Sequence, residues 1–125
     1  MEMVKKYSPA SEFFIDEGCY ITELHNTDRD AVCSIARARV GPGRTTKLHC
    51  LRDIIERYII LEGGGEVEIG DKGLVAVGAM DVVLVPAGVP QCISNNGSID
   101  LVFLCICTPR FVTDNYLDLD ARYGQ

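Results

Sequence analysis

Short apolar, β-branched segments recur along this chain at regular intervals, and turn-forming residues separate them. Gly, Pro and Asn mark the turns at residues 41–43, 70–73 and 95–97. Segments of this length and spacing, with no long amphipathic helix, predict an all-β fold, an antiparallel sandwich or small barrel. Residues 3–14 and 112–121 are expected to be irregular or briefly helical. The expected strands cover residues 19–25, 32–40, 45–51, 56–61, 66–69, 73–77, 82–85, 91–94 and 101–107.

Length and charge narrow the class of protein. The 125 residues fit one domain, 1–125, with a barrel core at about 19–107. With 12 Lys and Arg against 18 Asp and Glu, the net charge is −6, which disfavours nucleic acid and anionic membrane surfaces as partners. No apolar run approaches the ~20 residues of a membrane span, and the first residues lack the apolar segment of a secretory signal. We therefore expect a soluble, cytoplasmic protein.

The cysteines are predicted to be reduced residues of the core. None forms a C-x-x-C pair, and most lie within apolar, strand-like segments, where a thiol acts as a small hydrophobe. Their spacing supports neither a disulfide framework nor a zinc site made of thiolates. The six are Cys19, Cys33, Cys50, Cys92, Cys105 and Cys107.

A few polar residues fall inside the expected strands. The alternation of a strand places His49 and Leu51 on one face, and Glu56 and Tyr58 share a face of the next strand. If both faces line the interior, these side chains converge from adjacent strands. A buried imidazole and carboxylate must then be paired, hydrogen-bonded or bound to a metal, because isolated buried charges are costly.

The spacing of Gly43, His49, Glu56 and Gly63 resembles the first motif of the cupin superfamily, G-x5-H-x-H-x3,4-E-x6-G. Every interval fits. The second histidine of that motif is replaced here by Leu51.

The second cupin motif, G-x5-P-x-G-x2-H-x3-N, also has a counterpart. Pro86, Gly88 and Asn95 fit it, while Met80 stands for its first glycine and Gln91 for its histidine. With its flanking strands the resemblance covers about residues 32–107. It implies a single-domain antiparallel β-barrel, a double-stranded β-helix of the jelly-roll type, similar to small cupin 2 conserved-barrel proteins.

The resemblance also implies a metal site with a reduced ligand set. In the family, the histidines and the glutamate of the two motifs bind a metal inside the barrel. Carried over, the ligands here are His49, Glu56 and Gln91, holding a divalent ion such as Fe, Mn, Ni or Zn. Leu51 cannot coordinate, and an amide oxygen is a weaker ligand than imidazole. In the alternative, His49 and Glu56 hydrogen-bond each other in a metal-free barrel and Gln91 is structural.

Several functions fit these residues, and the sequence leaves open whether the protein is an enzyme. The first is a small-molecule-binding cupin that acts as a metal-dependent enzyme on a small polar organic substrate. The second is a metal-free isomerase or epimerase in which His49 or Glu56 is the base and Tyr58 the acid. The third is a non-catalytic binding or sensing module. Glu56 and Tyr58 are the candidate catalytic residues, and Gln91 and Tyr58 are the candidate substrate contacts.

Two further features concern the outside of the barrel. Arg37 and Arg39 share one face of their strand, which is expected to be the outer surface; on the inner face they would form a clamp for a carboxylate or phosphate. The strand at 101–107 is apolar on both faces, so its outer face needs cover. A homodimer is the expected cover, as is common in the family; the alternative is the segment 3–14 with its Phe13 and Phe14.

Overall fold

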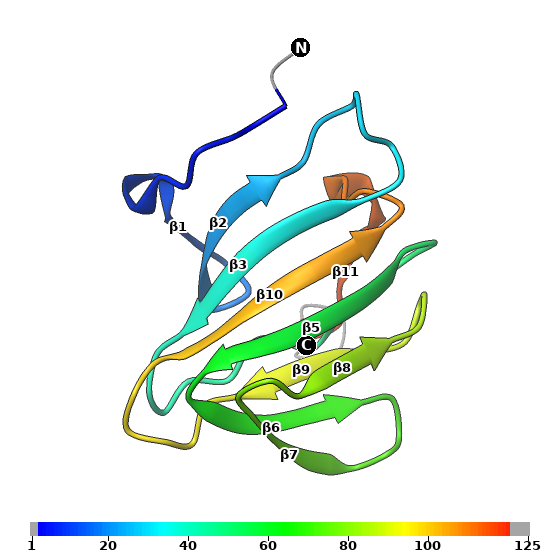
Figure 1. Ribbon diagram of the computed structural model, residues 1–125. Coiled ribbons are helices and arrows are strands. Elements are labelled where there is room, and N and C mark those ends of the chain that lie inside the picture. The colour runs from blue at the N-terminus through cyan, green and yellow to red at the C-terminus, as the bar shows by residue number, and fades with distance from the viewer. Residues whose placement is uncertain (1–2, 121–125) are drawn as a thin grey trace.

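The computed structural model describes residues 3–120 as two antiparallel sheets that face each other (Figure 1). This arrangement confirms the predicted all-β barrel of the jelly-roll type. Two 3-10 turns, η1 (Pro9–Ser11) and η2 (Thr113–Asn115), lie near the ends. Sheet A has the order β1 (Phe13–Ile15), β2 (Cys19–His25), β3 (Ser34–Val40), β10 (Leu101–Thr108), β5 (Ile55–Glu62) and β8 (Val82–Val85). Sheet B has the order β11 (Tyr116–Asp118), β4 (His49–Leu51), β9 (Gln91–Ser94), β6 (Gly64–Ile69) and β7 (Leu74–Gly78).

Each of the nine expected strands has a counterpart, although the one expected at 45–51 is limited to His49–Leu51, and the terminal segments contain two more. The segment 3–14 was expected to be irregular or helical, but β1 begins within it at Phe13 and pairs with β2. Within 112–121, β11 pairs with β4 after the single turn η2; Ala121 lies outside the described residues. β11 is stabilised by a neighbour distant in sequence, which local patterns do not reveal, whereas β1 forms a hairpin with the strand that follows it.

The core lies between the two sheets, where alternate side chains of each strand meet. Cys19 and Cys107 belong to the core clusters, Cys50 is also buried, and all six cysteines are free thiols. No helix among residues 3–120 has the length and apolar character needed to cross a membrane. The largest apolar side chains that are almost completely enclosed are Ile54, Ile60, Ile93, Leu101, Val40 and Val85.

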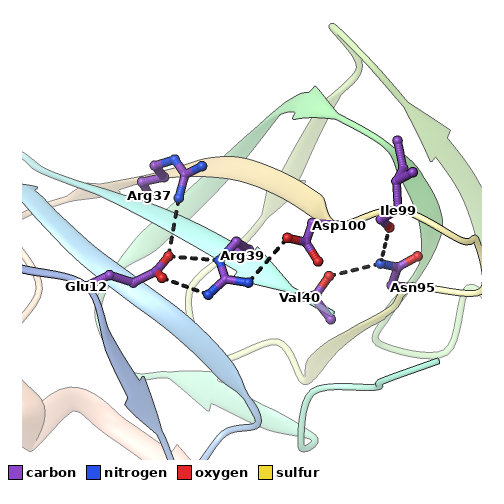
Figure 2. Close-up of polar contacts among 7 residues, drawn as sticks. All are labelled: Glu12, Arg37, Arg39, Val40, Asn95, Ile99 and Asp100. Carbon is purple, nitrogen blue, oxygen red and sulfur yellow. Dashed lines mark hydrogen bonds and ion pairs between the residues drawn. The ribbon is translucent and has the colours of Figure 1, made fainter. Parts of the chain in front are cut away.

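Arg37 and Arg39 lie on the outer face of sheet A, where Glu12 binds both (Figure 2). Glu12 Oε1 accepts from Arg39 Nη2 at 2.7 Å, and its Oε2 lies 3.3 Å from Arg37 Nη1. Arg39 also reaches Asp100 at 3.2 Å and lies over the ring of Tyr20, 4.1 Å from its centroid. The hydrogen bond from Arg39 lowers the pKa of Glu12. These contacts hold the residue before β1 against β3, and they thereby help to position the turn at residues 16–18 that follows β1.

The outer face of β10 is not covered by Phe13 and Phe14. These residues pair with Ile21 and Tyr20 of β2 at the edge of sheet A. In the order of that sheet, both β2 and β3 separate β1 from β10. The alternative in which Phe13 and Phe14 cover β10 is therefore wrong.

Met80 occupies the position of the missing motif glycine, and its backbone has a φ of 72°. Its N–H donates to the carbonyl of Ile60 at 2.7 Å, which holds this left-handed turn in place, and its side chain is 76% exposed. Left-handed backbone costs an L-residue roughly 1–2 kcal/mol, whereas glycine adopts it freely.

Met80→Gly is therefore expected to raise the free energy of unfolding by about 0.5–1 kcal/mol, after the greater entropy of the unfolded glycine chain is subtracted. Urea denaturation at neutral pH measures the change. Met80→Ala is the control, because it removes the same exposed side chain and keeps the strain. A Gly variant no more stable than the Ala variant would contradict this prediction, and one clearly less stable than the Ala variant would show that the turn is unstrained.

Candidate functional site

A cavity of about 460 Å³ lies in the barrel interior, between the inner faces of the two sheets. Most of its lining is apolar. His49 and Leu51 reach it from β4, and Glu56 and Tyr58 reach it from β5. The interior therefore brings together the polar residues that strand alternation placed on one face.

A chain of hydrogen bonds fixes three of the predicted site residues. The Tyr58 hydroxyl donates to Gln91 Oε1, and Gln91 Nε2 donates to Glu56 Oε1 at 2.8 Å. All three side chains are buried. Because the amide oxygen accepts from Tyr58, it is the NH2 group of Gln91 that faces the carboxylate. Tyr58 is thus linked to Glu56 through the amide, and it also lines the cavity.

Glu56 is a buried carboxyl group with a raised pKa. Burial raises the pKa of Glu56 to about 6, and the hydrogen bond from Gln91 opposes that rise. The Cys107 thiol lies 3.8 Å from its other oxygen, Oε2. A carboxyl group with this pKa populates both its protonated and its ionised form near neutral pH, as a general acid or base requires. Burial also raises the pKa of Tyr58 well above its usual value, so this hydroxyl stays protonated.

His49 is held in a defined orientation by two neighbours. Its Nδ1 lies 2.8 Å from the carbonyl oxygen of Lys47, and its ring stacks on Tyr116 with centroids 5.1 Å apart. A carbonyl oxygen only accepts hydrogen bonds, so Nδ1 carries the proton. In the neutral imidazole, Nε2 then has a free lone pair, which is the atom that a general base uses.

Glu17 faces that lone pair, and the sequence analysis did not find it. Its Oε1 lies 3.5 Å from His49 Nε2, longer than a strong hydrogen bond. Burial raises the pKa of Glu17, while the nearby His49 lowers it. Glu17 lies in the turn between β1 and β2 and belongs to neither motif, so no local pattern marked it. Only the pairing of β1 with β2 brings it into the cavity.

Two expectations about His49 and Glu56 need correction. They do not lie on adjacent strands, because β4 belongs to sheet B and β5 to sheet A. Nor does the direct hydrogen bond between them form in the described part of the chain: His49 lies against Glu17, while Glu56 accepts from Gln91. The interior thus contains two separate acid–base groups instead of one pair.

The donor atoms do not fit a divalent metal centre. The Gln91 amide presents NH2 to Glu56, and its oxygen, the atom that coordinates metals, accepts from Tyr58. Among residues 3–120, no three His, Cys, Asp or Glu side chains are grouped so as to hold a metal ion.

Comparison with protein families decides the classification. The cupin domain family, of the cupin 2 type, matches residues 36–107, which is more than half of the chain. The chain is a cupin. Cupins form a superfamily of small-molecule-binding proteins and enzymes, and many bind metals. No curated protein matches this cupin in sequence.

Solved structures resemble this cupin over most of its length. A predicted oxalate decarboxylase from Thermotoga maritima is 27% identical, with a TM-score of 0.67 over 73% of this chain and 80% of that chain. A cupin 2 conserved barrel protein from Salinispora arenicola is 18% identical, with a TM-score of 0.73 over 86% and 89% of the two chains. A Streptomyces nucleoside dehydratase, solved with uridine, is 17% identical, with a TM-score of 0.74 over 93% and 91%.

Proposed function

We propose that this cupin is an enzyme that moves a proton on a small polar organic substrate, as in an isomerisation or the elimination of water. The observation that carries the proposal is the pair formed by His49 Nε2 and Glu17 Oε1, 3.5 Å apart at the wall of a cavity of about 460 Å³. Such a cavity is large enough for a metabolite of modest size. The similarity in fold to a nucleoside dehydratase is compatible with this class of reaction.

In the proposed step, His49 Nε2 takes a proton from a carbon atom of the substrate. The imidazolium that forms carries a proton on each nitrogen; the Lys47 carbonyl accepts from Nδ1 and the Glu17 carboxyl group faces Nε2. In an isomerisation the same proton returns to a neighbouring carbon. In an elimination, a protonated Glu17 or Glu56 gives its proton to the departing hydroxyl group, which leaves as water. Either sequence balances without an oxidant or a reductant.

The remaining polar residues position these groups. Gln91 holds the Glu56 carboxylate through its NH2 group, and Tyr58 orients that amide. Tyr116 stacks on the ring of His49 and limits its rotation. No step passes through a metal ion, because the amide oxygen of Gln91 is turned away from Glu56.

The test is solvent-proton exchange. A panel of small hydroxylated, carbonyl and amino compounds is incubated with the protein in D2O, and NMR detects deuterium entering carbon positions or the loss of water. We expect at least one compound to react, with the rate unchanged by a chelator. His49→Gln should lower that rate by about 10²–10⁴-fold, the usual contribution of a general base.

Lys72→Ala, in the turn between β6 and β7, is the control and should react at the wild-type rate. A wild-type rate in His49→Gln would overturn the assignment of the base. So would a rate that appears only when a divalent metal is added.

We also propose that the protein is a homodimer joined through the outer face of sheet A. Ile59 pairs with Val82 on one side and with Leu104 on the other, which makes an apolar row across three strands. Val82 and Leu84 at the edge are 65% and 59% exposed. A second copy would remove this face from water.

Leu84→Lys is expected to convert the dimer to a monomer, because the introduced ammonium group would be buried in the interface. Light scattering coupled to size-exclusion chromatography measures the mass. Leu74→Lys, at an equally exposed position in sheet B, should leave the dimer intact. A wild-type monomer, or a dimer that survives Leu84→Lys, would contradict this interface.

A further inference from the structure

We propose that the cavity takes a small organic cation, a protonated amine carried on an apolar body, and that it rejects carboxylates and phosphates. This inference rests on the proposed function, because it names the substrate class of the same cavity. It follows from the charges and surfaces of the described lining residues, considered together.

The charged residues that line the cavity are acidic. The described lining includes no Lys and no Arg, and His49 is its one basic side chain. Glu17 and Glu56 lie deep in the cavity, whereas Asp16 and Glu23 are exposed and Asp118 is half-buried. The acidic lining residues are Asp16, Glu17, Glu23, Glu56 and Asp118. A ligand therefore meets negative charge both on entry and at the reacting groups.

The arginines that would reverse this potential are engaged elsewhere. Arg37 and Arg39 lie on the outer face of sheet A, where they bind Glu12 (Figure 2). Arg110 does not line the cavity; its Nε donates to Oδ1 of the lining residue Asn26 at 2.9 Å. A carboxylate or phosphate entering the cavity would thus meet like charges with no cationic partner among the described lining residues.

The acidic groups also repel one another. Burial is the main cause of the raised pKa of Glu56, and the negative charge of Glu17 adds to it. In the same way, the negative charge of Asp118 adds to the rise in the pKa of Glu17 that burial causes. A bound cation lying among them would relieve this repulsion, since opposite charges attract strongly in a partly enclosed site. The ammonium group of an amine supplies that charge with three N–H donors, and carboxylate oxygens are its natural acceptors.

The rest of the lining fits an apolar body. Phe13, Phe103 and Phe111 line the cavity together with aliphatic side chains such as Ile21 and Ile35. Aromatic faces attract cations, and apolar surface stabilises a hydrocarbon group by its removal from water. The cavity therefore combines a negative potential with a surface suited to a hydrophobic amine.

Three probes that share one ring test the charge preference: 2-phenylethylamine, 2-phenylethanol and 3-phenylpropanoate. They carry a positive charge, no charge and a negative charge at neutral pH. In isothermal titration calorimetry at low salt, we expect the amine to have a dissociation constant about tenfold lower than that of the alcohol. A ratio of this size is what one additional favourable charge contact provides. The propanoate should bind at least about tenfold more weakly than the alcohol.

The double variant Asp16→Asn, Glu23→Gln tests the source of the preference. It removes two exposed charges from the cavity rim without touching the proposed acid–base pair. We expect the amine to bind several-fold more weakly and the alcohol to bind as before. An amine that binds no better than the alcohol, or a propanoate that binds best, would overturn the inference. The absence of measurable amine binding would overturn it as well.

The binding series is independent of turnover, so the two proposals fail separately. A preference for the amine together with full exchange activity in His49→Gln would refute the proposed chemistry and leave the substrate class intact. Equal binding of amine and alcohol, with exchange lost in His49→Gln, would refute the substrate class alone.

Discussion

Glu17→Gln is expected to lower the turnover of the reacting compound by about 10²–10⁴-fold, an effect comparable to that of losing the base itself. The carboxyl group faces His49 Nε2, where in the proposed reaction it stabilises the imidazolium as a carboxylate and protonates the departing hydroxyl group as an acid. Glutamine keeps the size and the carbonyl oxygen of the side chain but cannot exchange a proton. The fold should not suffer, since the substitution removes a carboxyl group whose pKa burial has raised.

The pH profile separates this role from a merely structural one. If Glu17 ionises during catalysis, Glu17→Gln should abolish the rise or fall of kcat/KM with pH that this ionisation causes, which is one limb of the pH profile. A structural defect would instead lower kcat/KM by the same factor at every pH. Glu17→Asp is the matched variant: it keeps the carboxyl group but shortens it, so it should lower the rate and preserve the limb. A Gln variant with wild-type turnover would remove Glu17 from the mechanism.

The two motifs predicted the architecture well, because their intervals encode strand lengths and turns. His49, Glu56 and Gln91 are all buried in the barrel interior, as strand alternation and the family resemblance indicated. The motif spacing did not reveal which atoms face each other. The orientation of the Gln91 amide depends on the hydroxyl of Tyr58, a contact between β9 and β5 that spans the two sheets.

Residues supplied by the chain ends could not be predicted from local patterns. Glu17 reaches the cavity from a turn, and Tyr116 stacks on His49 because β11 pairs with β4. The position of Tyr116 depends on pairing between segments far apart in sequence. That of Glu17 depends on the hairpin of β1 and β2, whose three-residue first strand the apolar pattern did not mark. The salt bridges of Glu12 with Arg37 and Arg39 illustrate the same limit (Figure 2). The outer-face expectation for the arginines followed from alternation, whereas their partner came from the N-terminal segment.

The second large effect concerns stability and pH. The pKa of Glu56 in the folded protein is about 6, against an ordinary value of 4.5. A raised pKa means that the folded state holds the proton more tightly than the unfolded chain does. The stabilisation by this proton is therefore complete below about pH 4.5 and is lost as the pH rises through 6. A shift of this size corresponds to about 2 kcal/mol.

Glu56→Gln removes the ionisation and keeps a carbonyl oxygen that accepts from Gln91. At pH 8 the variant should therefore be more stable than the wild type by about 2 kcal/mol, with the difference vanishing near pH 4. Urea denaturation measured every half unit of pH from 4 to 8 gives the curve. Glu62→Gln, at an exposed position on the same strand, is the control and should change stability by less than about 0.5 kcal/mol throughout. If Glu56→Gln were instead the less stable protein at pH 8, the buried carboxylate would be a net stabilising group, and its proton would not be available near neutral pH for the proposed chemistry.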